Sequence, residues 1–138
     1  MKYLLLILSS VTLIFSSVLI AEEKPLSPLT IEGAVTIDTT KAKALYDDGA
    51  LFVDVRSSKD WAAGRIPDAV HIELKKVFNE HSLADEAAKN EIIIIYCNGE
   101  KCLRSSTASA KAVSWGFTKI HYYRDGFPAW KSAGYPTE

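Results

Sequence analysis

The chain has 138 residues, of which 48% are hydrophobic, and its formal net charge is −1. This length and composition fit one small globular domain. Basic and aromatic residues do not accumulate in any one segment, which argues against a nucleic-acid partner. No His/Cys pair has the spacing of metal ligands, so we expect neither a metal nor another cofactor. The scattered histidines are His71, His81 and His121.

Residues 1–21 form an apolar N-terminal segment. Lys2 precedes a run of apolar and hydroxyl-bearing residues that ends at Ala21, and two glutamates follow. This order is typical of a signal peptide, and cleavage after Ala21 would leave enough chain for one core. The run is also long enough to approach a membrane span, and Leu19 is larger than the residue preferred at its position before the cut. An uncleaved membrane anchor is therefore the alternative. In either case we expect the domain to be exported, in the periplasm or otherwise outside the cytoplasm.

The remaining chain divides into a linker and one folded unit. Residues 22–33 contain two prolines and predict a linker, so we place the domain at residues 34–138. Short apolar runs predict strands at residues 34–37, 51–55, 69–72, 92–96 and 120–123. Helices are predicted at residues 41–47, 74–89, 102–115 and 128–134, with a short helical turn after Ser57 and a break allowed near His81. Strands that alternate with helices indicate an α/β fold with a parallel sheet.

The predicted helix at residues 102–115 carries a row of residues with helical spacing. This row consists of Leu103, Thr107, Ala110 and Val113. Because these side chains recur on one face of a helix, we expect them to face the sheet.

Cys97 is the most informative residue for function. It follows the most apolar predicted strand, residues 92–96, and precedes a short polar loop and an Ala-rich helix. Open α/β sheets bind ligands at this end of their strands, and backbone N–H groups of the loop can converge there on an anion. The same surroundings lower the pKa of a thiol, and the thiolate is the nucleophilic form. The alternative is a buried structural cysteine that ends a strand.

Cys102 is the only other cysteine. Two cysteines in an oxidising compartment suggest a disulfide, but a bridge to Cys97 would close a very short loop and remove little entropy from the unfolded chain. A purely structural disulfide is therefore less attractive than a reactive one. We expect Cys102 to lie on the first helical turn and to point away from Cys97, towards the sheet. The alternative is a resolving thiol that reacts with Cys97.

Four segments resemble motifs of the rhodanese family. Residues 54–56 read Asp-Val-Arg, and residues 64–69 resemble the family's Gly-His-Ile-Pro-Gly-Ala loop, with Arg and Asp in place of His and the second Gly. Cys97 opens a glycine-containing loop that leads to Arg-Ser, as in the active-site loop of the family. Residues 124–130 resemble the closing Gly-Gly-x-x-x-Trp motif, with Asp125 in place of one glycine. The resemblance implies a rhodanese-like open parallel sheet of about five strands with helices on both faces.

The resemblance also implies a sulfurtransferase with Cys97 as its catalytic nucleophile. The Cys97 thiolate would take the outer sulfur of a donor such as thiosulfate, forming a persulfide, and pass it to a thiol or cyanide acceptor. The partners would then be a small sulfur-containing anion and a thiol acceptor. Asp54 and Arg56 would support the loops below the site, and Trp61 and Trp130 would lie in the core. The residues expected to bind the donor are Asn98, Gly99, Glu100, Lys101, Cys102, Leu103 and Arg104.

The active-site loop departs from the common family pattern Cys-x-x-Gly-x-Arg-Ser. Arg104 lies two positions further from Cys97 than that pattern requires. A longer loop would suit a larger oxyanion, but Leu103 stands where the family's phosphatase and arsenate reductase relatives have arginine. Two other classes stay open. One is a cell-envelope thiol/disulfide redox protein that uses Cys97 and Cys102, and the other is a non-catalytic rhodanese-like binding module.

Overall fold

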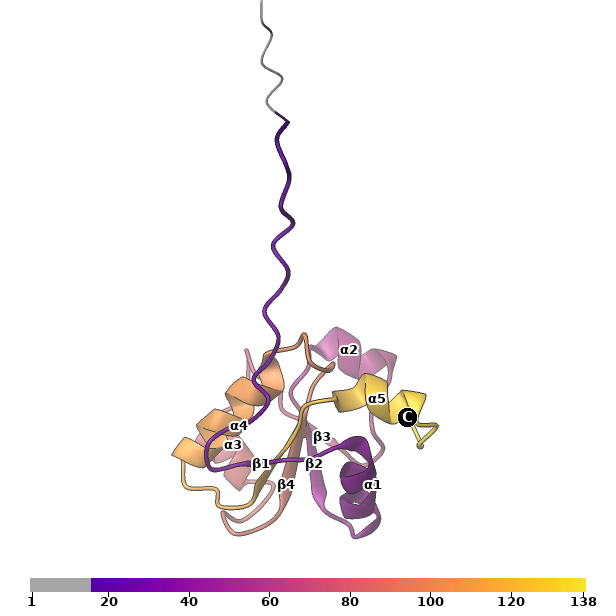
Figure 1. Ribbon diagram of the computed structural model, residues 1–138. Helices are drawn as coiled ribbons and strands as arrows, with labels where there is room; N and C mark the ends of the chain where they lie inside the picture. The colour runs from indigo at the N-terminus through magenta and orange to yellow at the C-terminus, as the bar shows by residue number, and fades with distance from the viewer. Residues whose placement is uncertain (1–15) are drawn as a thin grey trace, which may run out of the picture.

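The computed structural model of the protein describes residues 16–138. Its strands form one parallel sheet of five strands in the order β1-β5-β4-β2-β3 (Figure 1). This arrangement confirms the parallel α/β sheet that the alternating pattern predicts. The strands are β1 (Val35–Thr36), β2 (Leu51–Asp54), β3 (Val70–His71), β4 (Ile93–Tyr96) and β5 (Ile120–Tyr123).

The helices cover both faces of the sheet. They are α1 (Thr39–Asp47), α2 (Ser58–Ala63), α3 (Glu80–Ala84), α4 (Arg104–Ser114) and α5 (Gly126–Ser132). Helices α1 and α5 lie on one face and α3 and α4 on the other, while α2 lies beyond the carboxyl end of β2 (Figure 1). Asp38 and Ser57 cap the starts of α1 and α2, since their side chains accept hydrogen bonds from the amides of Lys41 and Asp60.

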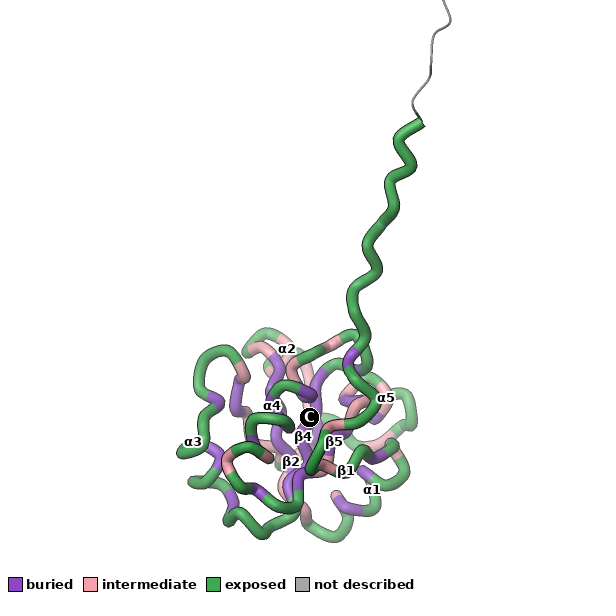
Figure 2. Tube along the Cα trace, turned by 60° about the vertical axis from the view of Figure 1, so that its left-hand side comes forward, coloured by how far each residue is buried: buried purple, intermediate pink, exposed green. Residues whose placement is uncertain are grey.

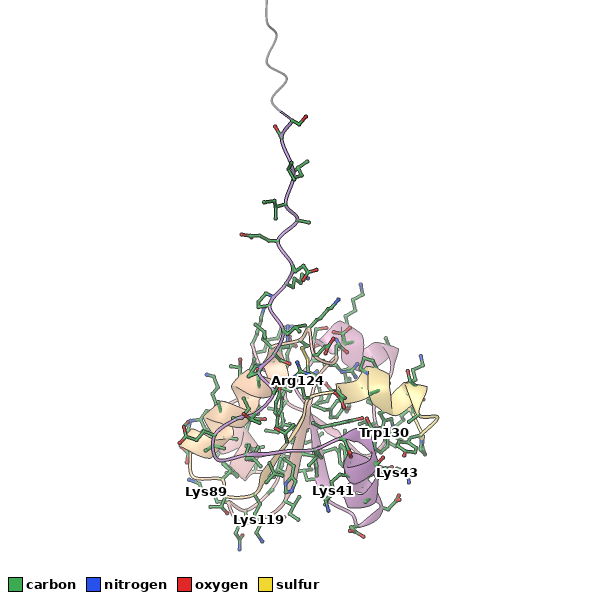
Figure 3. All side chains as sticks on the ribbon, viewed as in Figure 1. Lys41, Lys43, Lys89, Lys119, Arg124 and Trp130 are labelled. Carbon is green, nitrogen blue, oxygen red and sulfur yellow. A yellow bond between two sulfur atoms is a disulfide. The ribbon has the colours of Figure 1, made fainter. Side chains whose placement is uncertain are left out.

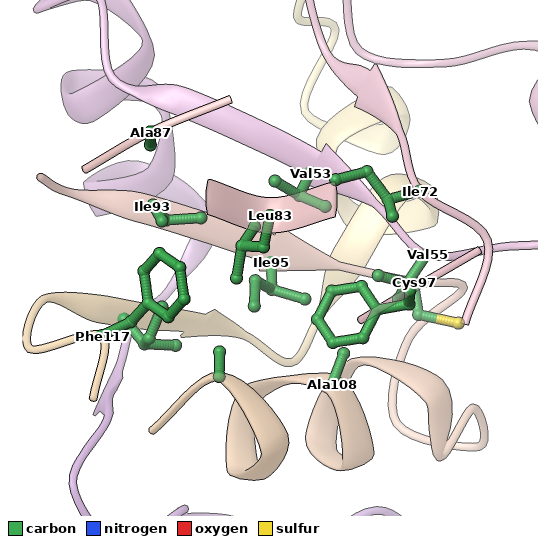
Figure 4. Packing of buried hydrophobic residues seen from close by; sticks show 13 residues of the cluster. Val53, Val55, Ile72, Leu83, Ala87, Ile93, Ile95, Cys97, Ala108 and Phe117 are labelled. Atoms are coloured by element: carbon green, nitrogen blue, oxygen red, sulfur yellow. The ribbon is translucent and has the colours of Figure 1, made fainter. Parts of the chain in front are cut away.

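The central strand β4 is buried on both faces. Ile93 and Ile95 pack in a cluster against α3 and α4, in which Cys97 lies at one end (Figure 4). Ile94 points to the opposite face and packs in a second cluster with α1 and α5. Figure 2 shows the buried residues gathered along the strands and the inner sides of the helices. A continuous apolar run is what a parallel strand covered on both faces requires.

The two tryptophans expected in the core have different surroundings. Trp130 is fully buried, as predicted. Trp61 is only partly buried: its ring stacks on His71 with centroids 4.8 Å apart, and the Arg65 guanidinium lies 4.5 Å from its centroid. The expectation for Trp61 is therefore wrong. The six-residue helix α2 buries none of its residues, so its tryptophan packs on a neighbouring loop instead.

The helix predicted at residues 74–89 is mostly absent, and that prediction is wrong. Three successive amides, of residues 76–78, donate to the Glu73 carbonyl oxygen at 3.0–3.2 Å and form a compact turn. Asn79 and Ser82 then exchange side-chain to backbone hydrogen bonds, which begins the short helix Glu80–Ala84. A reciprocal cap of this kind marks a helix start and separates it from the preceding turn.

The helix α4 is present where predicted, but most of its predicted sheet-facing row is wrong. Leu103 is 44% exposed, and Thr107 and Ala110 are exposed, whereas Val113 is partly buried and packs against the core cluster. Small residues cover the sheet instead. They are Ser105, Ser106, Ala108, Ser109 and Ala112. Small side chains allow a close approach of helix and sheet. They give the sequence almost no hydrophobic periodicity, however, so the buried face of the helix cannot be predicted from it.

Residues 1–15, which hold most of the predicted signal peptide or anchor, lie outside the described residues. From residue 16 onward, the structure contains no helix with the length and hydrophobicity needed to span a membrane. The chain is exposed up to Leu26, but Ser27 is buried (Figure 2). The Ser27 amide donates to the Glu100 carbonyl oxygen at 2.7 Å, and the Leu29 carbonyl oxygen accepts a hydrogen bond from the Thr36 hydroxyl at 3.0 Å. Residues 27–29 therefore pack against the domain.

Candidate active site

Cys97 lies directly beyond the carboxyl end of β4, as the sequence predicts. In the strand order, β3 lies next to β2 at one edge of the sheet and β5 lies next to β4 in the opposite direction. The chain therefore leaves β2 and β4 in opposite directions along the sheet. The loops after β2 and β4 therefore diverge, and open α/β sheets bind ligands at such a point. Cys97 is 1% exposed and forms the end of the apolar cluster under α4 (Figure 4).

The start of α5 packs tightly against the Cys97 loop. Gly126 has φ +63°, and a Cβ atom there would collide with the Cys97 carbonyl oxygen and lie 2.9 Å from the Gly99 amide nitrogen. The Phe127 amide donates to the Cys97 carbonyl oxygen at 2.9 Å. Only glycine combines this backbone conformation with so close an approach. The closing motif at residues 124–130 therefore contacts the Cys97 loop directly and restricts its shape.

Cys97 and Cys102 form a disulfide, with their Cα atoms 6.3 Å apart. The expectation that Cys102 points away from Cys97 is therefore wrong. The loop curls at Gly99, whose φ is +98° and whose carbonyl oxygen accepts a hydrogen bond from the Cys102 amide at 3.0 Å. This turn brings the second thiol back over the end of β4. Cys102 remains partly exposed, whereas Cys97 is buried.

The backbone of the loop offers several free donors. Within the described chain, the amides of Gly99, Glu100, Lys101 and Leu103 donate no hydrogen bond to another group of the protein. The first turn of α4 also has no side-chain cap. Unpaired N–H groups beside a helix N-terminus favour an anion. These amides are therefore the donors that the loop offers to an anion near Cys97.

Arg56 connects the loops around the site. Its guanidinium donates to both carboxylate oxygens of Asp54, the shortest contact being 2.7 Å, and both side chains are almost completely buried. It also donates to the Gly64 carbonyl oxygen at 2.6 Å and to Asn98 Oδ1 at 3.2 Å. The Phe127 ring lies 4.5 Å from the guanidinium. The buried pair therefore lies where the sequence expects support for the loops, and it reaches the active-site loop itself through Asn98.

The outer side of the loop is held by contacts that the sequence analysis missed. Asn98 Nδ2 donates to the Asp60 carboxylate at 3.1 Å. The Glu100 carboxylate lies 3.5 Å from Arg124, whose guanidinium also donates to the Ser27 carbonyl oxygen at 3.0–3.2 Å. Figure 3 shows Arg124 at the base of the N-terminal segment. These contacts join residues that lie far apart in the sequence, and no local pattern signals them.

Arg104 does not point into open solvent. Its guanidinium donates to the Val55 carbonyl oxygen at 3.3 Å and lies 3.5 Å from the Glu73 carboxylate. Burial acts to raise the pKa of Glu73, but a hydrogen bond from Ser58 and the cationic partners Lys76 and Arg104 outweigh it, so the pKa lies below its usual 4.5. The positive charge of Arg104 is therefore already paired next to the site. Lys101, by contrast, is exposed.

Two buried tyrosines lie on the face of the sheet opposite to Cys97. Burial, together with the charge of Asp54, holds the pKa of Tyr96 far above its usual value, and its hydroxyl accepts a hydrogen bond from the Ile66 amide at 3.3 Å. Burial raises the pKa of Tyr123 to about 12. Both hydroxyls therefore stay protonated at neutral pH.

An open pocket of about 390 Å³ lies beside the loop, between residues 98–101 and the first turns of α5. A larger cavity, of about 600 Å³, lies at the opposite end of the sheet, near Gly49 and Ile92, and is remote from Cys97. No group of three or more His, Cys, Asp or Glu residues within residues 16–138 could hold a metal ion.

The sequence matches the family description "Rhodanese-like domain" over residues 38–133. It is 34% identical over 106 residues to a thiosulfate sulfurtransferase, GlpE, from Pseudomonas savastanoi pv. phaseolicola, covering 74% of this chain and 91% of the relative. It is 27% identical over 117 residues to the protein HIGH ARSENIC CONTENT 1, mitochondrial, of Arabidopsis thaliana, covering 78% and 68% of the two chains. The crystal structure of the BH2092 protein from Bacillus halodurans has a similar fold, with a TM-score of 0.67, 26% identity, and coverage of 75% of this chain and 76% of that chain.

Proposed function

Since the chain belongs to the rhodanese-like family, we propose that it is a sulfurtransferase that works through a persulfide on Cys97. The donor is a small anion with a sulfane sulfur, such as thiosulfate, and the acceptor is a thiol or cyanide. The observation that carries the proposal is the position of Cys97, at the carboxyl end of β4 under a loop with free amides. The similarity to a thiosulfate sulfurtransferase over most of the domain supports the choice of donor.

The reaction has two steps. The reduced Cys97 thiolate attacks the outer sulfur of thiosulfate, a new S–S bond forms, and the donor's S–S bond breaks, with its electron pair leaving on sulfite. An acceptor thiolate or cyanide then attacks the outer sulfur of the persulfide and restores the Cys97 thiolate. Both enzyme forms are anionic, so the loop amides and the N-terminus of α4 stabilise them.

The other residues of the loop have different tasks in this proposal. Glycine at position 99 permits the curl, and the amides of the loop hold the donor anion. Lys101 is the exposed cation that attracts the anion. Arg104 acts as a positioning residue, because its guanidinium is engaged by Glu73 and by the Val55 carbonyl oxygen. Asp54 and Arg56 keep the loop in place through Asn98.

The proposed function predicts that Cys97→Ser removes sulfur transfer but preserves the fold. The hydroxyl has a similar size and is far less nucleophilic at neutral pH. Sulfite release from thiosulfate, measured on protein that has been reduced and freed of reductant, tests this directly. The wild type should release sulfite, whereas Cys97→Ser should release none and its intact mass should remain unchanged. A folded Cys97→Ser protein that releases sulfite at the wild-type rate would overturn the assignment.

A thiol/disulfide redox protein is the second candidate, because the two cysteines are joined in the structure. Such a protein would exchange its disulfide with other thiols but would release no sulfite from thiosulfate. The sulfite measurement therefore separates the two functions.

We also propose that residues 1–21 direct the domain out of the cytoplasm, either as a cleaved signal peptide or as an anchor. Their apolar composition after Lys2 supports export. A disulfide also persists more readily in an oxidising compartment. The intact mass of the protein isolated from its cells distinguishes cleavage from anchoring.

A further inference from the structure

We propose that Cys102 attacks the persulfide on Cys97 and releases its outer sulfur as sulfide. This inference rests on the proposed function, because it begins from the persulfide that the first step makes. It adds an activity: the chain reduces thiosulfate to sulfite and sulfide with its own two thiols. An external dithiol then restores the reduced protein.

The first support is the reach of Cys102. Its sulfur is bonded to that of Cys97 within the folded loop, and the Cα atoms lie 6.3 Å apart, inside the usual range for a disulfide. The curl at Gly99 and the hydrogen bond from the Cys102 amide to its carbonyl oxygen hold the loop in this shape. The second thiol is therefore already placed to attack the Cys97 sulfur from within the loop.

The second support is the difference in exposure between the two sulfur-bearing residues. Cys97 is 1% exposed, whereas Cys102 is partly exposed. An acceptor from solution has less access to a sulfur on Cys97 than a neighbour in the same loop has. An intramolecular thiol also has a high effective concentration, which favours it over an acceptor from solution.

The chemistry balances without any other oxidant. The Cys102 thiolate attacks the Cys97 sulfur, the Cys97–Cys102 bond forms, the bond to the outer sulfur breaks, and that sulfur leaves with the electron pair as hydrosulfide. Both cysteine thiols are oxidised to the disulfide, and the sulfane sulfur is reduced to sulfide. The disulfide in the structure is the product of this step.

Regeneration requires a dithiol reductant, either a small dithiol or a protein with a pair of reactive thiols. Its first thiolate attacks the sulfur of the more exposed residue, Cys102, and forms a mixed disulfide there. The electron pair of the broken bond goes to Cys97, at the start of the loop that carries the free amides. The second thiol of the reductant then releases Cys102. In this order, Cys97 leaves as the thiolate, and the free loop amides stabilise it better than they would a thiolate on Cys102.

The test is a single turnover without oxygen. The full-length protein is reduced, freed of reductant and mixed with thiosulfate, and sulfite, sulfide and intact mass are measured. We expect one sulfite and one sulfide per chain and a final mass lower by two hydrogens than that of the reduced protein. The same protein kept without thiosulfate must remain reduced, which excludes oxidation by air.

Cys102→Ser should release sulfite but no sulfide, and its mass should stay higher by one sulfur atom. A small monothiol such as glutathione should then release the sulfur from this variant, which shows that the persulfide is competent. Cys102→Ala, checked for folding by circular dichroism, guards against an effect of the serine hydroxyl. Wild-type protein that releases sulfite and keeps a stable persulfide overturns this inference and leaves the proposed function standing. Wild-type protein that releases neither product overturns the proposed function itself.

Discussion

Arg56 connects several loops around the candidate active site. Its buried guanidinium joins the end of β2 to the Gly64 loop and, through Asn98, to the loop of Cys97. Asp54 supplies the balancing charge, and both side chains of the pair are at most 3% exposed. A buried ion pair contributes little net stability by itself, but the loss of one partner leaves a buried charge without compensation.

We therefore expect Asp54→Asn to lower the free energy of unfolding by about 3–5 kcal/mol. The amide has nearly the same shape as the carboxylate, so the change removes charge and little volume. Asp47→Asn is the matched control, because Asp47 forms an exposed i,i+4 pair with Lys43 at 2.6 Å. The control should cost no more than about 0.5 kcal/mol. Urea denaturation followed by tryptophan fluorescence measures both, and equal losses would contradict the role given to the buried pair.

The two sulfur atoms illustrate a different point about single residues. Cys97 could be identified from its place in the chain, because a strand of high hydrophobicity ends immediately before it. The behaviour of Cys102 could not, since it depends on how tightly the loop curls at Gly99. A disulfide across this loop constrains few residues of the unfolded chain, so it adds little stability to the fold. We therefore expect its main role to be chemical.

At the scale of elements, α4 determines how the active-site loop meets the sheet. The helix lies on the strands through serine and alanine side chains, which brings its N-terminus close to the end of β4. Two of these side chains lower the stability of the fold. The hydroxyls of Ser105 and Ser109 are buried and have no hydrogen-bond partner among the described residues. An unpaired buried hydroxyl lowers stability by its lost hydration.

Ser109→Ala should therefore raise the free energy of unfolding by about 1 kcal/mol. Part of any gain comes from the better helix propensity of alanine. Ser114→Ala, on the exposed end of the same helix, includes that propensity effect but removes a hydroxyl that donates to the Lys111 carbonyl oxygen. Ser109→Ala should exceed Ser114→Ala in chemical denaturation. A lower stability of Ser109→Ala than of wild type would show that the hydroxyl contributes to packing.

At the scale of the whole molecule, Glu73 connects parts of the domain that are distant in sequence. Its carboxylate accepts a hydrogen bond from Ser58 of α2 at 2.9 Å and lies 3.5 Å from both Lys76 and Arg104. These partners favour the ionised form and place the pKa of Glu73 below its usual 4.5 in the folded state. Folding is therefore linked to the ionisation of this carboxyl group.

A lowered carboxyl pKa fixes the direction of the pH dependence. The contribution of Glu73 is fully present above the usual pKa of 4.5 and is lost as the pH falls through the lower folded value, because the unfolded chain takes up the proton first. We expect wild-type protein to lose stability in this acidic range, and Glu73→Gln to show a smaller loss over the same range. Urea denaturation of both proteins at neutral and at acidic pH measures the difference. Parallel curves would show that other carboxylates carry the acid sensitivity.

The sequence by itself determined the α/β class, the strand positions, the approximate bounds of most helices and the position of Cys97 at the end of a strand. These features have local causes: runs of apolar residues, capping residues such as Asp38 and Ser57, and a thiol at the end of a strand. It failed at residues 74–89, where a turn on the Glu73 carbonyl oxygen competes with a helix.

Only the tertiary structure decided which side of α4 meets the sheet, how the Cys97 loop closes and where Arg104 directs its charge. Each of these depends on contacts between distant segments, such as Arg104 with Glu73 or Ser27 with Glu100. Small buried side chains and backbone hydrogen bonds make these contacts, and neither leaves a periodic signal in the chain. The pairing of Cys97 with Cys102 belongs to the same group, because the curl of the loop depends on the close approach of Gly126 from α5.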